Sequence, residues 1–363
     1  MIARIAPYVV LFLTTGYGVL LVWLLWRARL NYTSLPLMQL TAGPDAPPDC
    51  MVIVPARDEE KNIARVIKSF PPDTVIVVDD GSTDNTARVA EAAGAGVMKA
   101  PALRPGEVGK VSACISGAKA LTTRWILFAD ADTHYDPDFL HSAVALAEAN
   151  GLSFVSFQLQ YETEGWIEAI LVPYATALFF TALDPVKRAA LAFNGQCILA
   201  RRDSYEFIGG HGSLATALSD DVGLALLAER HRMKHTMLRA SNYGHARLHE
   251  GWDGLWTGIR RNALRFSAQR VILGVSILLT AVLAALAFPI AAFLAYEKQL
   301  VAAVGILLLP GILLWPWYGT WKALFLGPIA TILMLPIVIN AGVAGLLSPN
   351  ALWKGRILTS PAR

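Results

Sequence analysis

Two aspartates, Asp130 and Asp132, directly follow the apolar run Trp125–Ala129, which predicts a buried strand. Two carboxylates one residue apart at the end of a buried strand are unfavourable unless a positive charge neutralises them. A divalent cation with oxygen ligands, Mg²⁺ or Mn²⁺, would do so and would bridge to the phosphates of a bound nucleotide. A solvated acidic turn is the competing interpretation, so the case for chemistry depends on the surrounding sequence.

Acidic and polar segments also follow two other predicted strands. Strands are expected at Met51–Val54 and Thr74–Val78, and the segments behind them read ARDEE and DDGSTD. Helices are expected between the strands, which is the pattern of βαβ units around a mainly parallel sheet. Ligands of such sheets bind where the strands end. The recurrence of acidic sequence at that edge therefore predicts one shared site.

The residues expected to bind a nucleotide come from these three loops and from the helix predicted before Trp125. The metal ion is assigned to Asp132, with Asp130 beside it, and would stabilise negative charge on a leaving phosphate. Lys110 would add a point charge at the same diphosphate. The residues assigned to nucleotide binding are Ala56, Arg57, Glu59, Asp80, Lys110 and Asp130.

A second acidic pair, Asp220 and Asp221, precedes the helical pattern Val222–Arg230. One explanation is capping, because acidic groups are stabilised at the positive end of a helix. The other is catalysis, in which Asp221 accepts the proton of an acceptor hydroxyl that attacks the anomeric carbon of a sugar. Direct attack with one base would invert that centre. Asn194 could meet the acceptor or satisfy backbone groups.

The ends of the chain are apolar and its middle is not. Hydrophobic residues make up 55% of the 363 residues, which is more than an ordinary soluble domain contains. The net charge of +3 argues against a nucleic-acid partner, and three widely spaced cysteines argue against a disulfide framework or a zinc site. We expect a transmembrane anchor at 1–30, a linker at 31–49, the catalytic domain at 50–250, an amphipathic interfacial helix at 251–270, transmembrane helices at 271–350 and a tail at 351–363.

The expected membrane segments predict a multi-pass protein. Ile5–Trp26 carries no charge and is long enough to span a bilayer. Arginines follow this stretch, so its C-terminal side and the catalytic domain are expected in the cytoplasm, at a bacterial inner membrane. Trp256 lies on the apolar side of the predicted interfacial helix and Arg261 largely off it, although a core-facing helix would show the same pattern. Of the three apolar stretches that follow, Leu300–Tyr318 need not cross completely.

The motifs VPARDEEKNI, VVDDGSTDNT, FADADTHYDPDFL and LSDDVGLAL, with Gly109-Lys110 between them, occur in the order and spacing of the family 2 glycosyltransferases. The chain resembles this family from about Cys50 to Ala268. The resemblance implies the GT-A fold, which is Rossmann-like, and a nucleotide-sugar donor, for which UDP is the expected nucleotide. It also implies that Asp132 is the metal ligand and Asp221 the catalytic base.

Two further segments, GWIEAILVP and WTGIRRNALR, are similar to a membrane-bound branch, the hopene-associated glycosyltransferases. Arg261 falls where processive members of the family carry the arginine of a QxxRW motif. The glutamine and tryptophan of that motif are missing here, and this departure favours the transfer of a single sugar over polymerisation.

We therefore expect an inverting, metal-dependent glycosyltransferase that moves one sugar from a nucleotide-diphosphate donor to a membrane lipid, a hopanoid, a carotenoid or a similar molecule. A polyprenyl phosphate is the alternative acceptor, supported by the basic residues Arg201, Arg202 and Arg261. A non-catalytic membrane protein that binds nucleotide sugars is a different possibility. Such a protein would need Asp132 but not Asp221.

Overall fold

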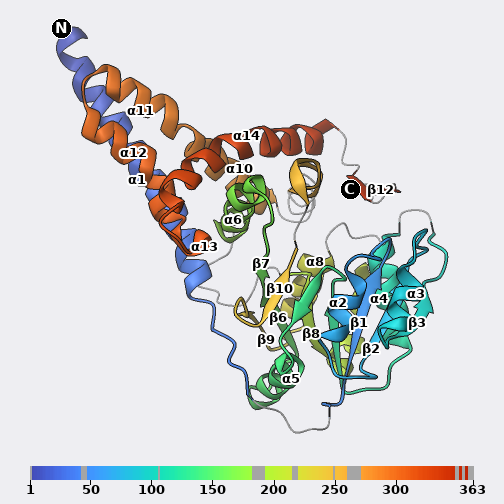
Figure 1. Ribbon diagram of the computed structural model, residues 1–363. Coiled ribbons are helices and arrows are strands. Elements are labelled where there is room, and N and C mark those ends of the chain that lie inside the picture. Colours follow the sequence, from blue (N-terminus) through green and yellow to red (C-terminus); the bar gives the residue numbers. More distant parts are fainter. Residues whose placement is uncertain are drawn as a thin grey trace. The chain divides into compact units, whose positions relative to one another are not determined.

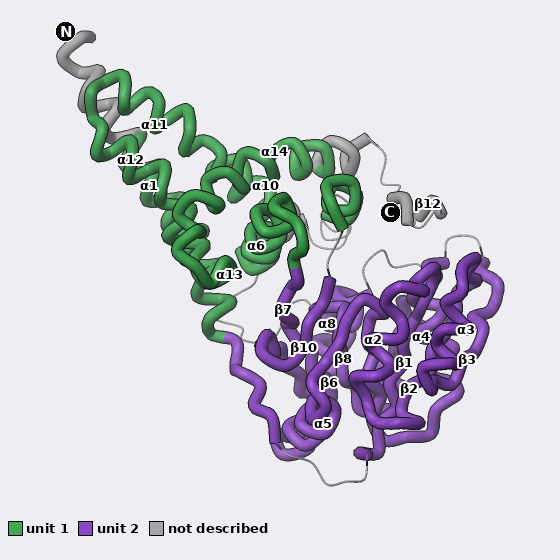
Figure 2. Tube along the Cα trace, viewed as in Figure 1, with its two compact units in different colours: residues 1–34, 163–186, 249–349 green, residues 35–162, 187–248, 350–363 purple. Residues whose placement is uncertain are grey.

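The computed structural model describes residues 2–41, 47–104, 107–181, 193–214, 220–247, 250–259, 271–347, 351–353 and 356–358 (Figure 1). The chain forms two compact units, which Figure 2 distinguishes by colour. The α/β unit comprises residues 35–162, 187–248 and 350–363, and the helical unit comprises residues 1–34, 163–186 and 249–349.

A seven-stranded sheet in the order β3-β2-β1-β4-β8-β6-β9 forms the centre of the α/β unit. The first four strands of this order are parallel to one another, and β9 is parallel to β6. Strand β8 is antiparallel to both of its neighbours. The prediction of a mainly parallel sheet is therefore confirmed. The strands are β1 Cys50–Ala56, β2 Val75–Asp79, β3 Gly96–Lys99, β4 Trp125–Ala129, β6 Phe154–Gln158, β8 Cys197–Arg201 and β9 His235–Arg239.

Two apolar clusters, one on each face of the sheet, make the core of this unit. Val52 and Val54 of β1 belong to one cluster and Ile53 to the other, because side chains alternate along a strand. The first cluster includes α2, α3 and α5, and the second includes α4, α7 and α8. Coverage on both faces explains why the strands are continuous apolar runs. The helices are α2 Ile63–Lys68, α3 Thr86–Ala92, α4 Gly109–Lys119, α5 Phe139–Ala149, α7 Arg202–Phe207, the 3₁₀ helix η1 Gly210–Leu214 and α8 Asp220–Arg230.

A small three-stranded sheet was not predicted. It consists of β5 (Thr133–Tyr135), β10 (Gly244–Ala246) and β7 (Gln160–Tyr161), with β10 in the middle, antiparallel to β5 and parallel to β7. Strands of two or three residues are too short to produce a period in the sequence. The sheet joins the segment after Asp132 to two distant parts of the chain.

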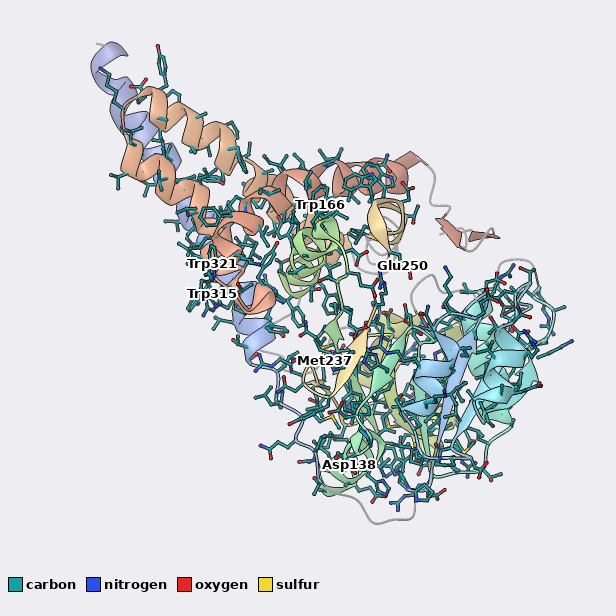
Figure 3. The ribbon with its side chains drawn as sticks, in the orientation of Figure 1. Asp138, Trp166, Met237, Glu250, Trp315 and Trp321 are labelled. Carbon is teal, nitrogen blue, oxygen red and sulfur yellow. The ribbon has the colours of Figure 1, made fainter. Side chains whose placement is uncertain are left out.

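The helical unit contains most of the exposed apolar surface. Of the large hydrophobic side chains that are exposed in the described part of the chain, all but Leu37 and Phe207 belong to this unit. Trp166, Trp315 and Trp321 are examples (Figure 3). The helices are α1 Ile2–Thr33, α6 Trp166–Thr181, α10 Val271–Ala285, α11 Ala287–Tyr296, α12 Leu300–Leu313, α13 Trp315–Tyr318, α14 Ala323–Leu347 and a helix at 251–259.

The helical unit includes one helix from the segment that we placed in the domain at 50–250. Helix α6 packs against α1, α10 and α14 and therefore belongs to the helical unit.

Helices α12 and α14 approach closely at two glycines. A Cβ atom on Gly311 would lie 2.4 Å from the Ala323 carbonyl oxygen, and one on Gly327 would lie 2.7 Å from Gly311 Cα. Small residues allow such contacts between apolar helices.

Two stretches of the described helices, Val275–Tyr296 and Ala323–Ala341, are long and apolar enough to cross a membrane. The expected span at Leu300–Tyr318 is divided into α12 and α13, and the 14 residues of α12 are fewer than the roughly 20 that a bilayer requires. The anchor at 1–30 is part of α1, but the side chains before residue 14 lie outside the described ones. Residues 260–270 of the interfacial helix also lie outside the described residues.

Gly117 sets the distance between α4 and the sheet, and this provides a test of the fold. A Cβ atom there would lie 2.8 Å from Ile53 Cγ2 and 3.1 Å from Val78 Cγ2. We predict that Gly117→Ala lowers the free energy of unfolding by about 1–3 kcal/mol, because α4 must move away from β1 and β2. Thermal unfolding in detergent measures this. Gly96→Ala is the control, since its Cβ would meet nothing nearer than 3.8 Å; equal midpoints for the two variants would contradict the prediction.

Candidate active site

The loops after β1 and β2 are joined into one structure. The Asp58 amide donates to Ser82 Oγ (3.0 Å), and the Thr83 amide donates to Asp58 Oδ1 (2.7 Å). The hydrogen bond from Thr83 is the main reason that the pKa of Asp58 is lowered. The Glu59 amide donates to Thr86 Oγ1 (2.8 Å). The two segments predicted to bind the nucleoside therefore hold each other in place.

Ala56, Arg57 and Asp80 lie together at the ends of these strands, as predicted. The Asp80 amide donates to the Ala56 carbonyl oxygen (2.9 Å), and Arg57 Nη1 is 3.9 Å from Asp80 Oδ2. Asp80 is buried. A buried carboxylate beside a guanidinium is a well-defined acceptor for the hydroxyl or N–H groups of a ligand.

Lys110, the second residue of α4, connects several parts of the site. Its Nζ is 2.6 Å from Asp130 Oδ1 and 3.8 Å from Asp220 Oδ2, and it donates to the Gly195 carbonyl oxygen (2.9 Å). Burial alone would lower the pKa of Lys110, but the charges of Asp130 and Asp220 outweigh it and raise the pKa. The ammonium group therefore stays charged and is held between the two predicted acidic pairs.

Asp132 has the surroundings of a cation ligand. Its Oδ1 is buried and accepts no hydrogen bond from any residue that the structure describes. Burial raises the pKa of Asp132 well above its usual range, and the charges of Asp130 and Glu59 raise it further. Crowded carboxylates of this kind ionise together only when a cation joins them. Asp132 and Asp130 thus fit a hard divalent cation such as Mg²⁺ or Mn²⁺.

Asp221 stands in the first turn of α8, where the helix dipole stabilises a carboxylate. Its Oδ1 accepts a hydrogen bond from the Val222 amide (2.7 Å). A Cβ atom on Gly195 would lie 3.0 Å from Asp221 Oδ2, so only glycine fits there without displacing the carboxylate. Asp220 is buried and faces Lys110. The two aspartates of this pair therefore have different surroundings, which the sequence did not distinguish.

Tyr161 is a candidate that the sequence analysis missed. Burial raises the pKa of Tyr161 to about 12, hydrogen bonds with the Gln158 and Asn194 side chains oppose this, and the charges of Asp132 and Asp221 add to it. The Tyr161 hydroxyl thus interacts electrostatically with both the predicted metal ligand and the predicted base, and Asn194 is one of its hydrogen-bond partners. The tyrosine is in β7, which gave no signal in the sequence.

His211 is buried beside the second acidic pair. The His211 amide donates to Tyr205 Oη (3.1 Å), and this oxygen also lies within hydrogen-bond distance (2.8 Å) of His211 Nδ1. Nε2 lies 3.9 Å from Asp220 Oδ2. Burial lowers the pKa of His211 to about 4, so the ring is neutral near pH 7.

Trp256 and Arg261, of the predicted interfacial helix, are the other residues expected to meet the acceptor. Trp256 lies in the helix at 251–259 of the helical unit, where its ring is 5.8 Å from that of Trp252. Leu255 and Ile259 of the same helix are buried, in keeping with an amphipathic pattern. Arg261 lies outside the described residues. A role for either residue at the acceptor stays a prediction.

The buried His211 ring predicts a loss of stability in acid. Its pKa of about 4 in the folded chain is below the ordinary value of 6.5, so the unfolded chain binds this proton first. Stability therefore falls as the pH falls from about 6.5 to 4, by up to about 3 kcal/mol for this group. His211→Gln keeps a donor and removes the titration, so its melting temperature should fall less on acidification. His231→Gln, at an exposed histidine, is the control; identical pH profiles for wild type and His211→Gln would contradict this.

Part of the chain is similar to known proteins. Residues 51–209 match the family model described as Glycosyl transferase family 2. The chain is 33% identical over 174 residues to the 4,4'-diaponeurosporenoate glycosyltransferases of Staphylococcus aureus strains USA300 and NCTC 8325, a region that covers 45% of this chain and 46% of each relative. The match thus spans less than half the length of these relatives.

Among solved structures, glucosyl-3-phosphoglycerate synthase from Mycobacterium tuberculosis, in complex with Mn²⁺ and UDP-glucose, is 21% identical with a TM-score of 0.45. That similarity covers 65% of this chain and 86% of the synthase. The family match falls on β1 to α7, the part of the chain that contains Asp80, Lys110 and Asp132. Residues 51–209 of this chain are therefore similar to the family 2 glycosyltransferases.

Proposed function

We propose that this protein is an inverting, metal-dependent glycosyltransferase that moves a single sugar from a nucleotide-diphosphate donor, with UDP as the expected nucleotide, to a membrane lipid. The observation that carries the proposal is the pairing of two carboxylates with different tasks at one edge of the sheet. Asp132 has a buried oxygen that accepts no hydrogen bond from the described residues, and Asp221 stands at the start of α8 against Gly195. Tyr161 is under the influence of both charges.

On the donor side, the joined loops after β1 and β2 would hold the nucleoside, with the Asp80 carboxylate as an acceptor for its hydroxyl or N–H groups. A divalent cation on Asp132 and Asp130 would neutralise the diphosphate and the charge that develops on the leaving phosphate. Lys110, which Asp130 and the Gly195 carbonyl oxygen hold in place, adds a fixed positive charge at this edge. Such preorganised charges stabilise a transition state more than mobile ones.

On the acceptor side, Asp221 would take the proton of the acceptor hydroxyl as its oxygen attacks the anomeric carbon. The bond between this carbon and the diphosphate oxygen breaks in the same step, the nucleoside diphosphate leaves, and the configuration inverts. Asp220 has a different task in this scheme. Its carboxylate faces Lys110 and His211 and therefore positions the ammonium group instead of accepting the proton.

An apolar acceptor agrees with two observations. The Staphylococcus relatives are named for 4,4'-diaponeurosporenoate, and the helical unit exposes many large apolar side chains and contains two stretches of membrane-spanning length. A polyprenyl phosphate has less support, because Arg201 and Arg202 are paired with Asp203 and Glu206. We therefore infer a carotenoid-like or hopanoid-like acceptor and a multi-pass protein of the bacterial inner membrane with its catalytic unit in the cytoplasm.

The direct test is transfer by the purified chain in detergent. A panel of nucleotide sugars is incubated with membrane lipid extract and Mn²⁺, Mg²⁺ or EDTA, and the lipids are analysed by mass spectrometry. A lipid that gains the mass of one sugar, in a reaction that EDTA stops, would confirm the proposal. Metal-dependent nucleotide binding without any product would favour the non-catalytic alternative.

The role of Asp221 is tested by Asp221→Asn. We predict that turnover falls about 10²- to 10⁴-fold, the usual contribution of a general base, while donor affinity stays close to that of the wild type. Initial rates and calorimetric nucleotide binding measure the two effects separately. Asp138→Asn is the control, because Asp138 is exposed (Figure 3) and makes no capping hydrogen bond with its side chain. Unchanged turnover in Asp221→Asn would rule out this base.

The role of Asp132 is tested by the metal dependence of nucleotide binding. We predict that Asp132→Asn removes the gain in UDP affinity that Mn²⁺ gives the wild type, because the buried oxygen that faces the cation loses its charge. Titration calorimetry of each variant, with Mn²⁺ and with EDTA, measures this. If Mn²⁺ strengthens UDP binding equally in both proteins, the metal ion lies elsewhere.

A further inference from the structure

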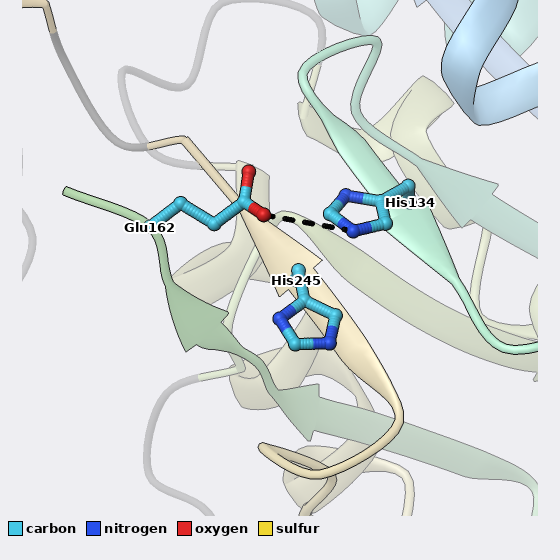
Figure 4. A group of neighbouring side chains, drawn as sticks. All are labelled: His134, Glu162 and His245. Atoms are coloured by element: carbon cyan, nitrogen blue, oxygen red, sulfur yellow. Dashed lines mark ion pairs between the residues drawn. The ribbon is translucent and has the colours of Figure 1, made fainter. Parts of the chain in front are cut away.

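Three possible metal ligands gather on the small sheet, and none of them is assigned to the transfer reaction. His134 of β5 and His245 of β10 are directly paired across the strands, and Glu162 follows β7 (Figure 4). One ring nitrogen of each histidine and one carboxylate oxygen of Glu162 all lie within 4.8 Å of one another. The two imidazole rings are stacked, with centroids 4.7 Å apart. No other group of three such ligands was found among the described residues.

The ligand atoms already surround a cationic group. Arg65 of α2 donates from Nη1 to Glu162 Oε2 (2.8 Å) and from Nη2 to Glu162 Oε1 (3.0 Å). Its Nη2 is also 2.8 Å from His134 Nε2. A guanidinium only donates hydrogen bonds, so His134 Nε2 must present its lone pair. A lone pair of imidazole and a carboxylate thus converge on one positively charged nitrogen, as they would on a metal ion.

Arg65 is not fixed in this position by burial. Its side chain is 58% exposed, and the Glu162 side chain is 31% exposed. Exposed ion pairs contribute little to stability, typically about 0–1 kcal/mol. The guanidinium can therefore leave at little cost and pass into solvent, which frees the carboxylate and the His134 nitrogen for another cation.

We propose that His134, His245 and Glu162 form a second metal site, which takes a first-row transition metal ion such as Zn²⁺ or Co²⁺ when Arg65 moves away. Two imidazoles and one carboxylate are a set that binds such ions, whereas the oxygen ligands at Asp132 suit Mg²⁺ and Mn²⁺. The remaining coordination position would be open to water.

A metal ion at this site would brace the part of the chain that carries Asp132. It would link β5, β10 and β7, which otherwise share only a few backbone hydrogen bonds. Arg247 lies two residues after His245, and the Arg247 amide donates to the Asp132 carbonyl oxygen (3.0 Å). The proposed ion would therefore act on the position of Asp132 through the backbone, without contact with the donor.

The test is Co²⁺ binding by the full chain in detergent, after removal of any histidine tag and of bound metal. Visible absorption reports imidazole ligation of Co²⁺, and Zn²⁺ competition gives the affinity. We expect one such ion per chain in the wild type and in Asp132→Asn. His245→Ala should weaken binding by more than about 100-fold, because even the supporting partners of metal ligands contribute 10- to 100-fold. Arg65→Met should strengthen binding, since it removes the competing cation.

A second ligand variant and a histidine outside the cluster serve as controls for the Co²⁺ binding experiment. Glu162→Gln provides a second ligand variant if His245→Ala does not fold, and it should also weaken binding. His231→Ala, at an exposed histidine outside the cluster, should bind Co²⁺ as the wild type does. Unchanged binding in both ligand variants, or loss of the signal in Asp132→Asn, would overturn the proposal. Because the readout is metal binding, these results do not depend on whether the chain transfers a sugar.

Discussion

The structure depends on the neutralisation of carboxylates at one edge of a sheet. Four aspartates reach this edge, namely Asp130, Asp132, Asp220 and Asp221. Repulsion among their negative charges destabilises the folded chain unless cations neutralise them. Lys110 provides the internal cation for Asp130 and Asp220. It leaves a buried oxygen of Asp132 without a partner among the described residues. The chain thus balances part of the charge by itself and leaves a place for a divalent ion.

The same arrangement explains why the two aspartates of the second acidic pair are not equivalent. Asp220 is buried between Lys110 and a histidine ring that is fixed by Tyr205. Asp221 instead lies against Gly195 and is only partly buried. A carboxylate that accepts a proton must be reachable by the acceptor, whereas a carboxylate that positions an ammonium group is better enclosed. Adjacent residues on a helix can meet these opposite needs because they point in different directions.

The sequence predicted those parts of the structure that depend on local patterns. The strand Trp125–Ala129 has the predicted bounds, since it is an apolar segment with clear ends. Lys110 and the acidic pairs were selected because their residue types carry charge. Tyr161 was not predicted, because its importance comes from contacts with residues far away in the chain. Helix α6, in the segment that we placed in the domain at 50–250, packs against helices of the helical unit, and an apolar helix has the same pattern against either partner.

Strand β8 lies between β4 and β6 in the sheet, yet it follows both of them in the sequence. Between β6 and β8 the chain leaves the α/β unit and forms α6 in the helical unit. The strand that completes the middle of the sheet is therefore synthesised only after a helix of the apolar unit. Until then, β4 and β6 each present an open edge of backbone groups, which is the form in which strands associate with other chains. The α/β unit is consequently not a continuous segment of the chain, and its central strand can be added only after α6 has been synthesised.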